Sequence, residues 1–351
     1  MMQYPLLLTG FMTRTARLSP KKEIVSVYGD STFRYTYGEW YRRTCQLAHA
    51  LKSLGIKKGD RVASFSLNNH RHLELYFGVP CMGAVLHTLN VRLSQEHLIY
   101  IVNHAKDRII FVDEDLYFLL EPVKDRLKTV KQYVIMSQSG KLPETSLAPV
   151  VLYDELIGEF PDHYDFPIER DENDPALLCY TSATTGDPKG VVYSHRGLVL
   201  HALTAGVVLG TKDSDCVLHV VPMFHANAWG APFASTMLGC KQVLPGRQIL
   251  DMKALCGIIS DEEVSFTCGV PTIWMMLHKY LEDSGEHDFS KLHAVYSGGS
   301  AMPRHLMEEM AKKYNFNIVQ AYGMTETSPL ATVALPKSYM TGYPEKELYD
   351  V

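Results

Sequence analysis

The sequence lacks the features that would place the protein in a membrane, a secretory pathway or a complex with nucleic acid. No apolar run reaches the roughly 18 residues that span a bilayer. The apolar patch within residues 1–12 has no basic region before it, so we expect no secretory signal. Net charge is −5 without a long basic run, which gives no reason to expect nucleic acid. The seven cysteines form no CxxC pair, a pattern typical of reduced thiols in a cytoplasmic protein.

Two catalytic signatures are also missing. No GxSxG motif is present, which argues against a hydrolase built on a nucleophile elbow. No Gly-Lys-Ser/Thr run occurs, so the common phosphate-binding P-loop is excluded. Any nucleotide site in this chain must therefore have another design.

What the chain does have is an ordinary globular composition and a regular alternation of strands and helices. Hydrophobic residues make up 46% and charged residues 21% of 351, which allows two or three subdomains around a large core. Strands are expected at 24–28, 32–35, 61–66, 84–88, 109–112, 132–136, 177–180, 191–194, 217–221, 242–244, 265–267, 294–297 and 318–321. Helices are expected from the Thr36/Glu39 capping box to near Gly55, at 73–82, from Ser94 to His104, and at 197–208, 252–262, 272–281 and 303–314, with Pro303 as first residue.

This alternation predicts an α/β fold of two stacked subdomains with mostly parallel sheets. The segment 137–172 is rich in Pro, Gly and acidic residues and has few periodic signals. We therefore place the boundary there, with a first α/β subdomain at 1–170. The second, at 171–351, would carry the ligand sites.

The stretch 180–195, YTSATTGDPKGVVYSH, lies between two β-branched or apolar runs and concentrates hydroxyl side chains around one glycine and one lysine. Such residues also occur in solvated hairpin turns. Oriented hydroxyls, free backbone N–H groups and a cation are, however, what a polyphosphate requires. The candidate phosphate ligands are Thr181, Ser182, Thr184, Thr185, Gly186 and Lys189.

Three later stretches follow predicted strands, and ligands of open α/β sheets bind at the carboxyl ends of strands. The first, 221–229 (VPMFHANAW), could line a pocket. The second, 297–300 (SGGS), has two glycines that allow a close backbone approach. The third, 320–327 (QAYGMTET), offers an aromatic ring, hydroxyls and a carboxylate. Taken alone, the first favours core or rim residues, the second is about equally compatible with a plain strand–helix turn, and the third is typical of a loop.

In order and spacing, the stretch 180–195 closely resembles the phosphate-loop signature of the adenylate-forming superfamily, which includes acyl-CoA synthetases. The segment FHANAW is most similar to bacterial and archaeal fatty-acyl-CoA synthetases, and YGMTE matches the family signature YGxTE. Further similarity at 59–69, 76–94 and 100–114 extends the resemblance over essentially the whole chain. One departure is Ala183, where the family usually has Gly.

The resemblance implies a role for each motif. Trp229 would gate the fatty-acid tunnel, with His225 and Ala226 beside the nucleotide and the acyl carboxylate. Gly299 would contact the nucleotide, Tyr322 would stack on adenine, and Gln320 and Ala321 would also contact adenine. Thr325 would meet the α-phosphate, and Glu326 with Thr181 would hold Mg²⁺. The implied catalytic residues are His225, Thr325, Glu326 and Lys189.

The implied reaction activates a medium- or long-chain fatty acid with ATP and transfers it to coenzyme A. Family members run on for a further domain that carries a ribose-binding aspartate and an adenylating lysine. We find neither signature, so we expect an N-terminal part without the mobile lid, with little or no turnover alone.

Two alternatives stay open: an adenylating enzyme for another carboxylic acid, and a nucleotide-binding module without turnover. An activator of amino acids should carry an acidic residue in the pocket, whereas VPMFHANAW is apolar. Contact with a membrane surface and a homodimer are also open, as is the acyl chain length.

Overall fold

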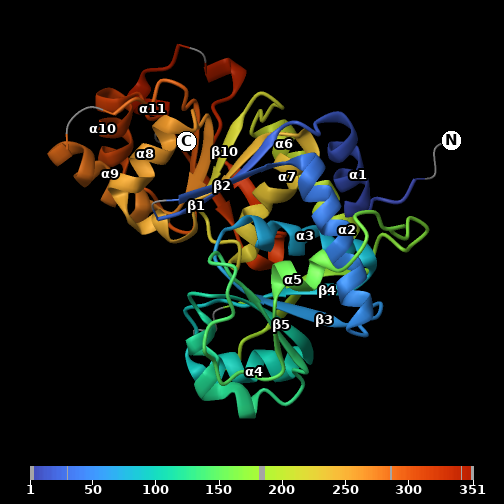
Figure 1. Cartoon of the computed structure of the whole chain (residues 1–351). Helices are drawn as coiled ribbons and strands as arrows, with labels where there is room; N and C mark the ends of the chain where they lie inside the picture. Colours follow the sequence, from blue (N-terminus) through green and yellow to red (C-terminus); the bar gives the residue numbers. More distant parts are fainter. Residues whose placement is uncertain (1–3, 30, 182–185, 285–286, 341, 349–351) are drawn as a thin grey trace.

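The computed structural model describes residues 4–29, 31–181, 186–284, 287–340 and 342–348. Figure 1 shows two sheets with helices between and around them. In spatial order, the seven-stranded sheet consists of β7 (Val150–Leu152), β6 (Gln132–Met136), β5 (Asp107–Asp113), β3 (Arg61–Phe65), β4 (Val85–Thr88), β8 (Pro175–Tyr180) and β9 (Gly190–Ser194). The eight-stranded sheet consists of β15 (Leu330–Val333), β14 (Ile318–Gly323), β13 (Ala294–Ser297), β12 (Phe266–Gly269), β10 (Cys216–His219), β11 (Lys241–Leu244), β1 (Glu23–Tyr28) and β2 (Ser31–Thr36).

Strand pairing is antiparallel for β1–β2, β8–β9 and β14–β15, and parallel for the other pairs in both sheets. The predicted α/β class with mostly parallel sheets is therefore confirmed. Sheet membership does not follow the expected division at residue 170, however. The hairpin β1–β2 joins the sheet of the second half, and the hairpin β8–β9 joins the sheet of the first half.

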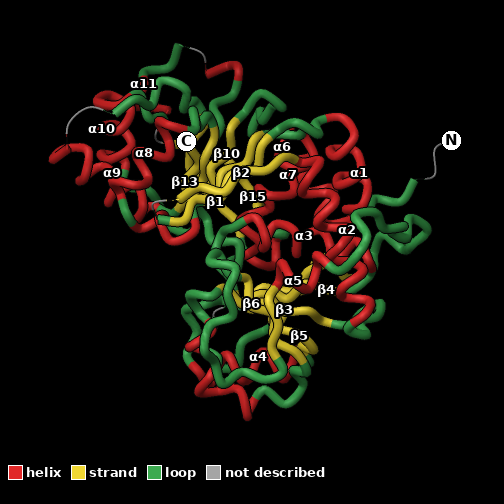
Figure 2. The backbone as a smooth tube through the Cα atoms, viewed as in Figure 1, coloured by secondary structure: helices red, strands yellow, loops and turns green. Residues whose placement is uncertain are grey.

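Helices form three layers around the two sheets (Figure 2). The middle layer contains α1 (Leu8–Leu18), α2 (Tyr37–Ser53), α3 (His70–Met82), α5 (Tyr153–Gly158), α6 (His195–Val208) and α7 (Ala231–Leu238). The outer layers are α8 (Met252–Asp261), α9 (Pro271–Ser284) and α10 (Arg304–Tyr314) on the eight-stranded sheet and α4 (Gln95–Ala105) on the other. A short α11 (Glu345–Leu348) follows. Every helix within the described ranges is too short or too polar to cross a membrane.

The layers follow from the two-residue period of the buried strands. Along β5, Ile109 and Phe111 join the core of the middle helix layer, whereas Ile110 and Val112 join the core beneath α4. Successive side chains of a strand point to opposite faces. A strand that is apolar at every position therefore needs helices on both sides, as parallel sheets generally do.

Most predicted elements are found within a few residues of their expected bounds. The capping box of Thr36 and Glu39 begins α2, and Ser94 caps α4 through the backbone N–H of His97. Pro303 is the residue before α10, with extended backbone angles, and not its first helical residue. The sequence patterns did not indicate the helices α1, α5, α7 and α11 or the strands β7 and β15. Residues 232–237 of α7 are all buried, so that helix has no polar face to reveal its period.

A buried ion-pair network joins three helices of the middle layer to β2 of the eight-stranded sheet. Glu74 on α3 is 0% exposed and receives hydrogen bonds from Arg43 (2.7 Å), Tyr35 (3.1 Å) and Tyr153 (2.5 Å). These donors come from α2, β2 and α5. Asp154 pairs in turn with Arg43 at 2.7 Å. A buried carboxylate is tolerated only when its oxygens are satisfied in this way.

We expect Glu74→Ala to lower the free energy of unfolding by about 3–5 kcal/mol, because it removes the acceptor of two buried hydroxyls and one of the two carboxylates that neutralise the partly buried Arg43 guanidinium. Glu155→Ala, on the exposed surface of α5, should stay within about 0.5 kcal/mol of the parent. Urea denaturation of the three proteins measures both effects. A loss below about 1 kcal/mol for Glu74→Ala would show that the network does not hold the layers together.

Candidate functional site

The carboxyl ends of four parallel strands meet at one edge of the eight-stranded sheet. The segments that leave β10, β12, β13 and β14 there include 220–230, 298–303 and 324–329. Two of the three stretches selected from the sequence thus follow neighbouring strands directly, and the third follows β10. Parallel pairing brings them together although they are up to 100 residues apart in sequence.

These segments enclose a pocket with about 430 Å³ of empty space. The sequence-predicted residues that line it are His225, Ala226, Trp229, Gly299, Ala321, Tyr322 and Thr325. The other lining residues are Gly298, Gly323, Met324, Pro329 and Leu330. The lining residues do not include five other predicted site residues, namely Lys189, Gly186, Thr181, Gln320 and Glu326. A concave pocket at this edge, with one aromatic ring and a few polar groups, is typical of a ligand site in an α/β protein.

One wall of this pocket is formed by β14 and the residues after it. Tyr322 is 57% exposed and so offers its ring for stacking. Thr325 begins the short 3₁₀ helix η5 (Thr325–Thr327), and the Tyr193 hydroxyl donates to its carbonyl oxygen at 2.6 Å. Because Tyr193 lies on β9, this bond fixes the loop after β14 to the strand that leaves the predicted phosphate loop.

The predicted phosphate loop connects β8 to β9, as expected from the sequence. Tyr180 pairs with Gly190, and the Thr181 N–H donates to the Lys189 carbonyl at 3.0 Å. Lys189 and Gly186 are exposed, and Gly186 has φ +77°, a conformation that glycine adopts without strain. The predicted ligands Ser182, Thr184 and Thr185, and also Ala183, lie outside the described residues.

The Gln320 side chain, which is predicted to contact the ligand, forms hydrogen bonds within the protein. Its side-chain oxygen accepts from the Met302 N–H at 2.9 Å, and its amide donates to the carbonyls of Ser300 (3.2 Å) and Ala321 (3.0 Å). The amide therefore braces the turn after β13 against β14. Its side-chain groups are already committed to bonds within the protein.

The segment 226–230 has an unusual backbone. Ala226, Asn227, Ala228 and Trp229 have φ between 43° and 55°, the left-handed region that costs an L-residue about 1–2 kcal/mol. Four such residues in succession persist only where the surroundings hold them, and such strain concentrates at functional sites. The turn places the Trp229 ring beside Gly298, where an added Cβ would lie 3.1 Å from the ring.

Trp229 lies between two cavities. On one side is the pocket of Tyr322 and Thr325. On the other is a cavity with about 520 Å³ of empty space whose walls are almost wholly apolar. The other residues of this second cavity are Ala205, Leu209, Thr211, Ala231, Ala234, Ser235, Phe266, Cys268, Tyr296, Ala321 and Leu330. A half-buried indole thus forms part of the wall of both a partly polar and an apolar space.

A third cavity, with about 1110 Å³ of empty space, also reaches His225 and is bounded by Arg92, Phe224 and Met276. The Arg92 guanidinium carbon lies 6.0 Å from the centre of the Phe224 ring. His225 is solvent-exposed at this rim. Partial desolvation and the neighbouring Arg92 lower the pKa of its imidazole, which favours the neutral ring.

His201 is a residue that sequence reasoning missed, because a lone histidine inside a helix gives no signal. It lies on α6 against the turn of Trp229, so close that a Cβ on Gly230 would lie 2.4 Å from its ring. Its Nε2 faces the Leu330 N–H at 3.4 Å, and burial lowers its pKa to about 4. A neutral ring therefore accepts from the segment after η5 while supporting the strained turn.

Residues 12–347 match the family described as AMP-binding enzyme, and the chain belongs to this family. The resemblance inferred from the sequence motifs is thereby confirmed. A long-chain-fatty-acid–CoA ligase from Thermus thermophilus is 45% identical over 350 residues, which are 99% of this chain and 62% of that protein.

A 3-methylmercaptopropionyl-CoA ligase from Ruegeria lacuscaerulensis is 40% identical, over 96% of this chain and 62% of that protein. This chain therefore spans about three fifths of the length of both relatives. Among solved structures, the anthranilate CoA ligase AuaEII in complex with anthranoyl-AMP superimposes with a TM-score of 0.86 at 22% identity. That match covers 95% of this chain and 63% of the other, and it supports the fold.

We expect Gly230→Ala to destabilise the protein by more than its backbone angle alone would cost. Gly230 has φ +76°, which costs alanine about 1–2 kcal/mol, and the clash with His201 adds about 1–3 kcal/mol of overpacking. Gly210→Ala is a matched control, because Gly210 has φ +66° with nothing within 4 Å of an added Cβ. Denaturant titration gives both values.

The double variant with His201→Ala and Gly230→Ala should lose at least about 1 kcal/mol less free energy of unfolding than the sum of the two single losses. The reason is that the two residues touch. Strict additivity of the two substitutions would mean that His201 does not support the turn of Trp229.

Proposed function

We propose that this chain supplies the nucleotide and acyl pockets of an ATP-dependent acid–CoA ligase. The observation that carries the proposal is the position of Trp229, which borders both the pocket of Tyr322 and Thr325 and the apolar cavity. A reaction that joins an apolar acid to a nucleotide needs two such adjoining spaces. The names of the two relatives, both CoA ligases, agree with it.

In the first step, an oxygen of the substrate carboxylate attacks the α-phosphorus of ATP. The bond to the β-phosphate bridging oxygen breaks, and pyrophosphate leaves. The carboxylate is already ionised near pH 7, so little proton transfer is needed. The protein must instead position the reactants and stabilise phosphate charge. We assign Thr325 and Lys189 to the phosphates, Tyr322 to the adenine face, and His225 to the reacting carboxylate.

Glu326 and Thr181 fit a hard cation such as Mg²⁺. Both offer oxygen, the donor that Mg²⁺ prefers. Glu326 is exposed and forms no ion pair with any of the described residues, so its charge is not already neutralised by the protein. When bound there, Mg²⁺ would neutralise charge on the phosphates.

In the second step, the thiol of coenzyme A attacks the acyl carbon of the adenylate and AMP leaves. We assign the thiol route to the third cavity, because it shares His225 with the pocket of Tyr322 and its other lining residues are different. Arg92 at its wall could pair with a phosphate of the cofactor. His225 would then separate the nucleotide from the arriving thiol.

We assign a fatty acid as the substrate because the second cavity has apolar walls of alanine, leucine and aromatic side chains. Trp229 would close this cavity until the nucleotide is bound. The rival is a shorter carboxylic acid, since one relative is named for 3-methylmercaptopropionate. The second rival is a module that binds nucleotide without turnover.

Calorimetry on this chain with a panel of non-hydrolysable acyl-adenylate analogues distinguishes a fatty-acid substrate from the two rivals. For a fatty acid, affinity should rise by about fourfold per buried methylene, or about 0.8 kcal/mol, up to a limit set by the cavity. Tightest binding of the 3-methylmercaptopropionyl analogue would favour the short acid. Equal affinity for AMP and all acyl analogues would favour a module without an acyl site.

Glu326→Gln should weaken Mg-ATP binding by at least about 10-fold, or about 1.4 kcal/mol, and AMP binding much less. Glutamine keeps the shape of the side chain and removes the charge that would serve the cation. Glu144→Gln, at an exposed position in the 137–149 loop, is the control and should leave both affinities unchanged. Equal losses for the two nucleotides would make Glu326 structural.

A further inference from the structure

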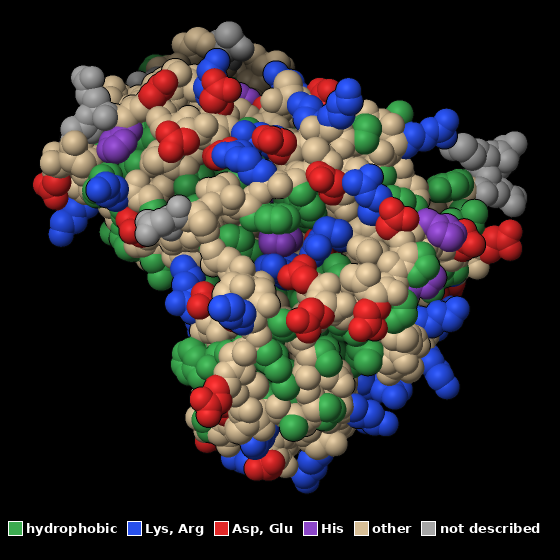
Figure 3. Space-filling model, viewed as in Figure 1, with side chains coloured by type: hydrophobic (Ala, Val, Ile, Leu, Met, Phe, Trp, Pro, Cys, Tyr) green, Lys and Arg blue, Asp and Glu red, His purple; other side chains and the backbone are tan. Residues whose placement is uncertain are grey.

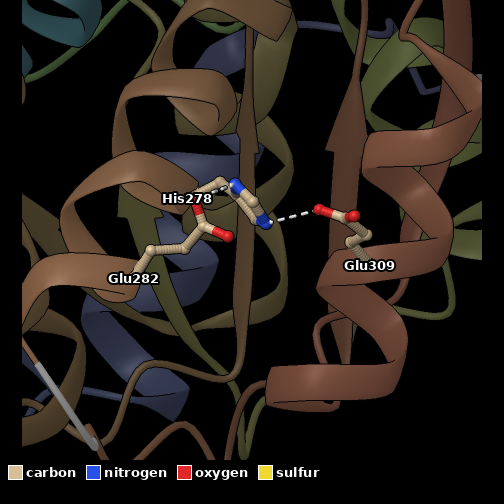
Figure 4. A group of neighbouring side chains, drawn as sticks. All are labelled: His278, Glu282 and Glu309. Carbon is tan, nitrogen blue, oxygen red and sulfur yellow. Dashed lines mark ion pairs between the residues drawn. The ribbon is translucent and has the colours of Figure 1, made fainter.

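A second constellation of ligand-type side chains lies away from the nucleotide pocket, between α9 and α10. Figure 4 shows His278 and Glu282 on α9 facing Glu309 on α10. One ligand atom from each residue lies within 4.8 Å of the others. The spacing i, i+4 on α9 places the first two side chains on one face of the helix, and the packing of α10 on α9 adds the third.

His278 is the unusual member of this group. It is 8% exposed, and its Nε2 atom is buried without an aligned hydrogen bond. Oε2 of Glu309 lies 3.0 Å from Nε2, and Oε2 of Glu282 lies 3.8 Å from Nδ1. The Nε2 and Oε2 atoms are close, but they are not aligned as a hydrogen-bond donor and its acceptor would be. This arrangement is better suited to two ligand atoms that bind the same cation.

A lysine already partly neutralises the two carboxylates. The Lys313 ammonium lies 3.0 Å from Glu282 Oε1 and 3.8 Å from Glu309 Oε2. All three of these side chains are 46–48% exposed. Exposed pairs of this kind are weak, so a cation that also gains the imidazole nitrogen can displace the ammonium into solvent.

We propose that His278, Glu282 and Glu309 form a binding site for a divalent transition-metal ion, Zn²⁺ in the first instance. One imidazole nitrogen and two carboxylate oxygens, with water as a fourth ligand, form a set that Zn²⁺ accepts. The nitrogen donor disfavours Mg²⁺, which prefers oxygen ligands and keeps its water. The site is thus chemically distinct from the one we assign to Glu326.

Occupancy of this site would fasten two neighbouring helices of the outer layer. His278 also contacts α10 through Tyr314, with ring centres 6.1 Å apart at 75°. A ligand that binds the folded state alone stabilises it in proportion to the logarithm of its concentration over Kd. The ion should therefore raise the melting temperature whether or not the chain turns over substrate.

The test is a zinc titration of the untagged chain, monitored by calorimetry and by thermal melting. We expect one Zn²⁺ per chain, a melting temperature that rises with Zn²⁺, and no rise with the same concentration of Mg²⁺. Glu309→Gln should weaken Zn²⁺ binding at least 10-fold, because it removes a charged ligand. His97→Gln replaces a distant histidine on α4 and should bind Zn²⁺ as the parent does.

Lys313→Met provides a test in the opposite direction. Because it removes the competing ammonium, it should strengthen Zn²⁺ binding severalfold, an effect that loss of structure could not imitate. Glu309 and Lys313 are both exposed, so neither variant should unfold the chain, and melting in the presence of a chelator checks this. Unchanged Zn²⁺ affinity in Glu309→Gln, or weakened affinity in Lys313→Met, would overturn the proposal.

Discussion

The candidate site depends on one constraint: parallel strands end at the same edge of their sheet. Strands β10, β12, β13 and β14 therefore deliver 220–230, 298–303 and 324–329 to one place. Hydrogen bonds between these segments then set their mutual positions. Gln320 connects β14 to the turn after β13, and Tyr193 connects β9 of the other sheet to Thr325. The pocket is thus a property of both sheets.

The two sheets are themselves joined by exchange of hairpins. Strands β1 and β2 leave the first half of the chain to extend the eight-stranded sheet, and β8 and β9 return to the seven-stranded one. The strands that flank the predicted phosphate loop, β8 and β9, consequently belong to one sheet, and β14 with Tyr322 belongs to the other. The buried carboxylate of Glu74 is bonded to residues of β2, α2 and α5, so the middle helix layer is fixed to the eight-stranded sheet at its β1–β2 hairpin. Figure 3 shows the charged side chains distributed over the outer surface of this assembly.

Sequence reasoning worked where the deciding interaction is local. The capping box of Thr36 and Glu39 spans four residues, and the continuous apolar run at 109–112 is visible without any partner strand. It failed where the partner is distant. Nothing near 24–36 in the sequence shows that this hairpin pairs with β11. Likewise α7, buried on almost every side, offers no periodic contrast between polar and apolar residues.

The same distinction applies to the site. The motif residues His225, Trp229 and Tyr322 could be selected from order and spacing, but the residue that holds them could not. His201 acquires its role only because α6 packs against the left-handed turn and against Leu330.

That turn also explains why Trp229 is suited to a gate. A tryptophan on a regular helix would be held by its backbone hydrogen bonds. Here its backbone lies in a costly region and depends on His201 and on the turn after β13 for support. A ligand that displaces the ring from Gly298 would therefore weaken one of these supports. In the gate that we propose, occupation of the pocket of Tyr322 and opening of the apolar cavity would then both follow from movement of the Trp229 side chain, which lines both spaces.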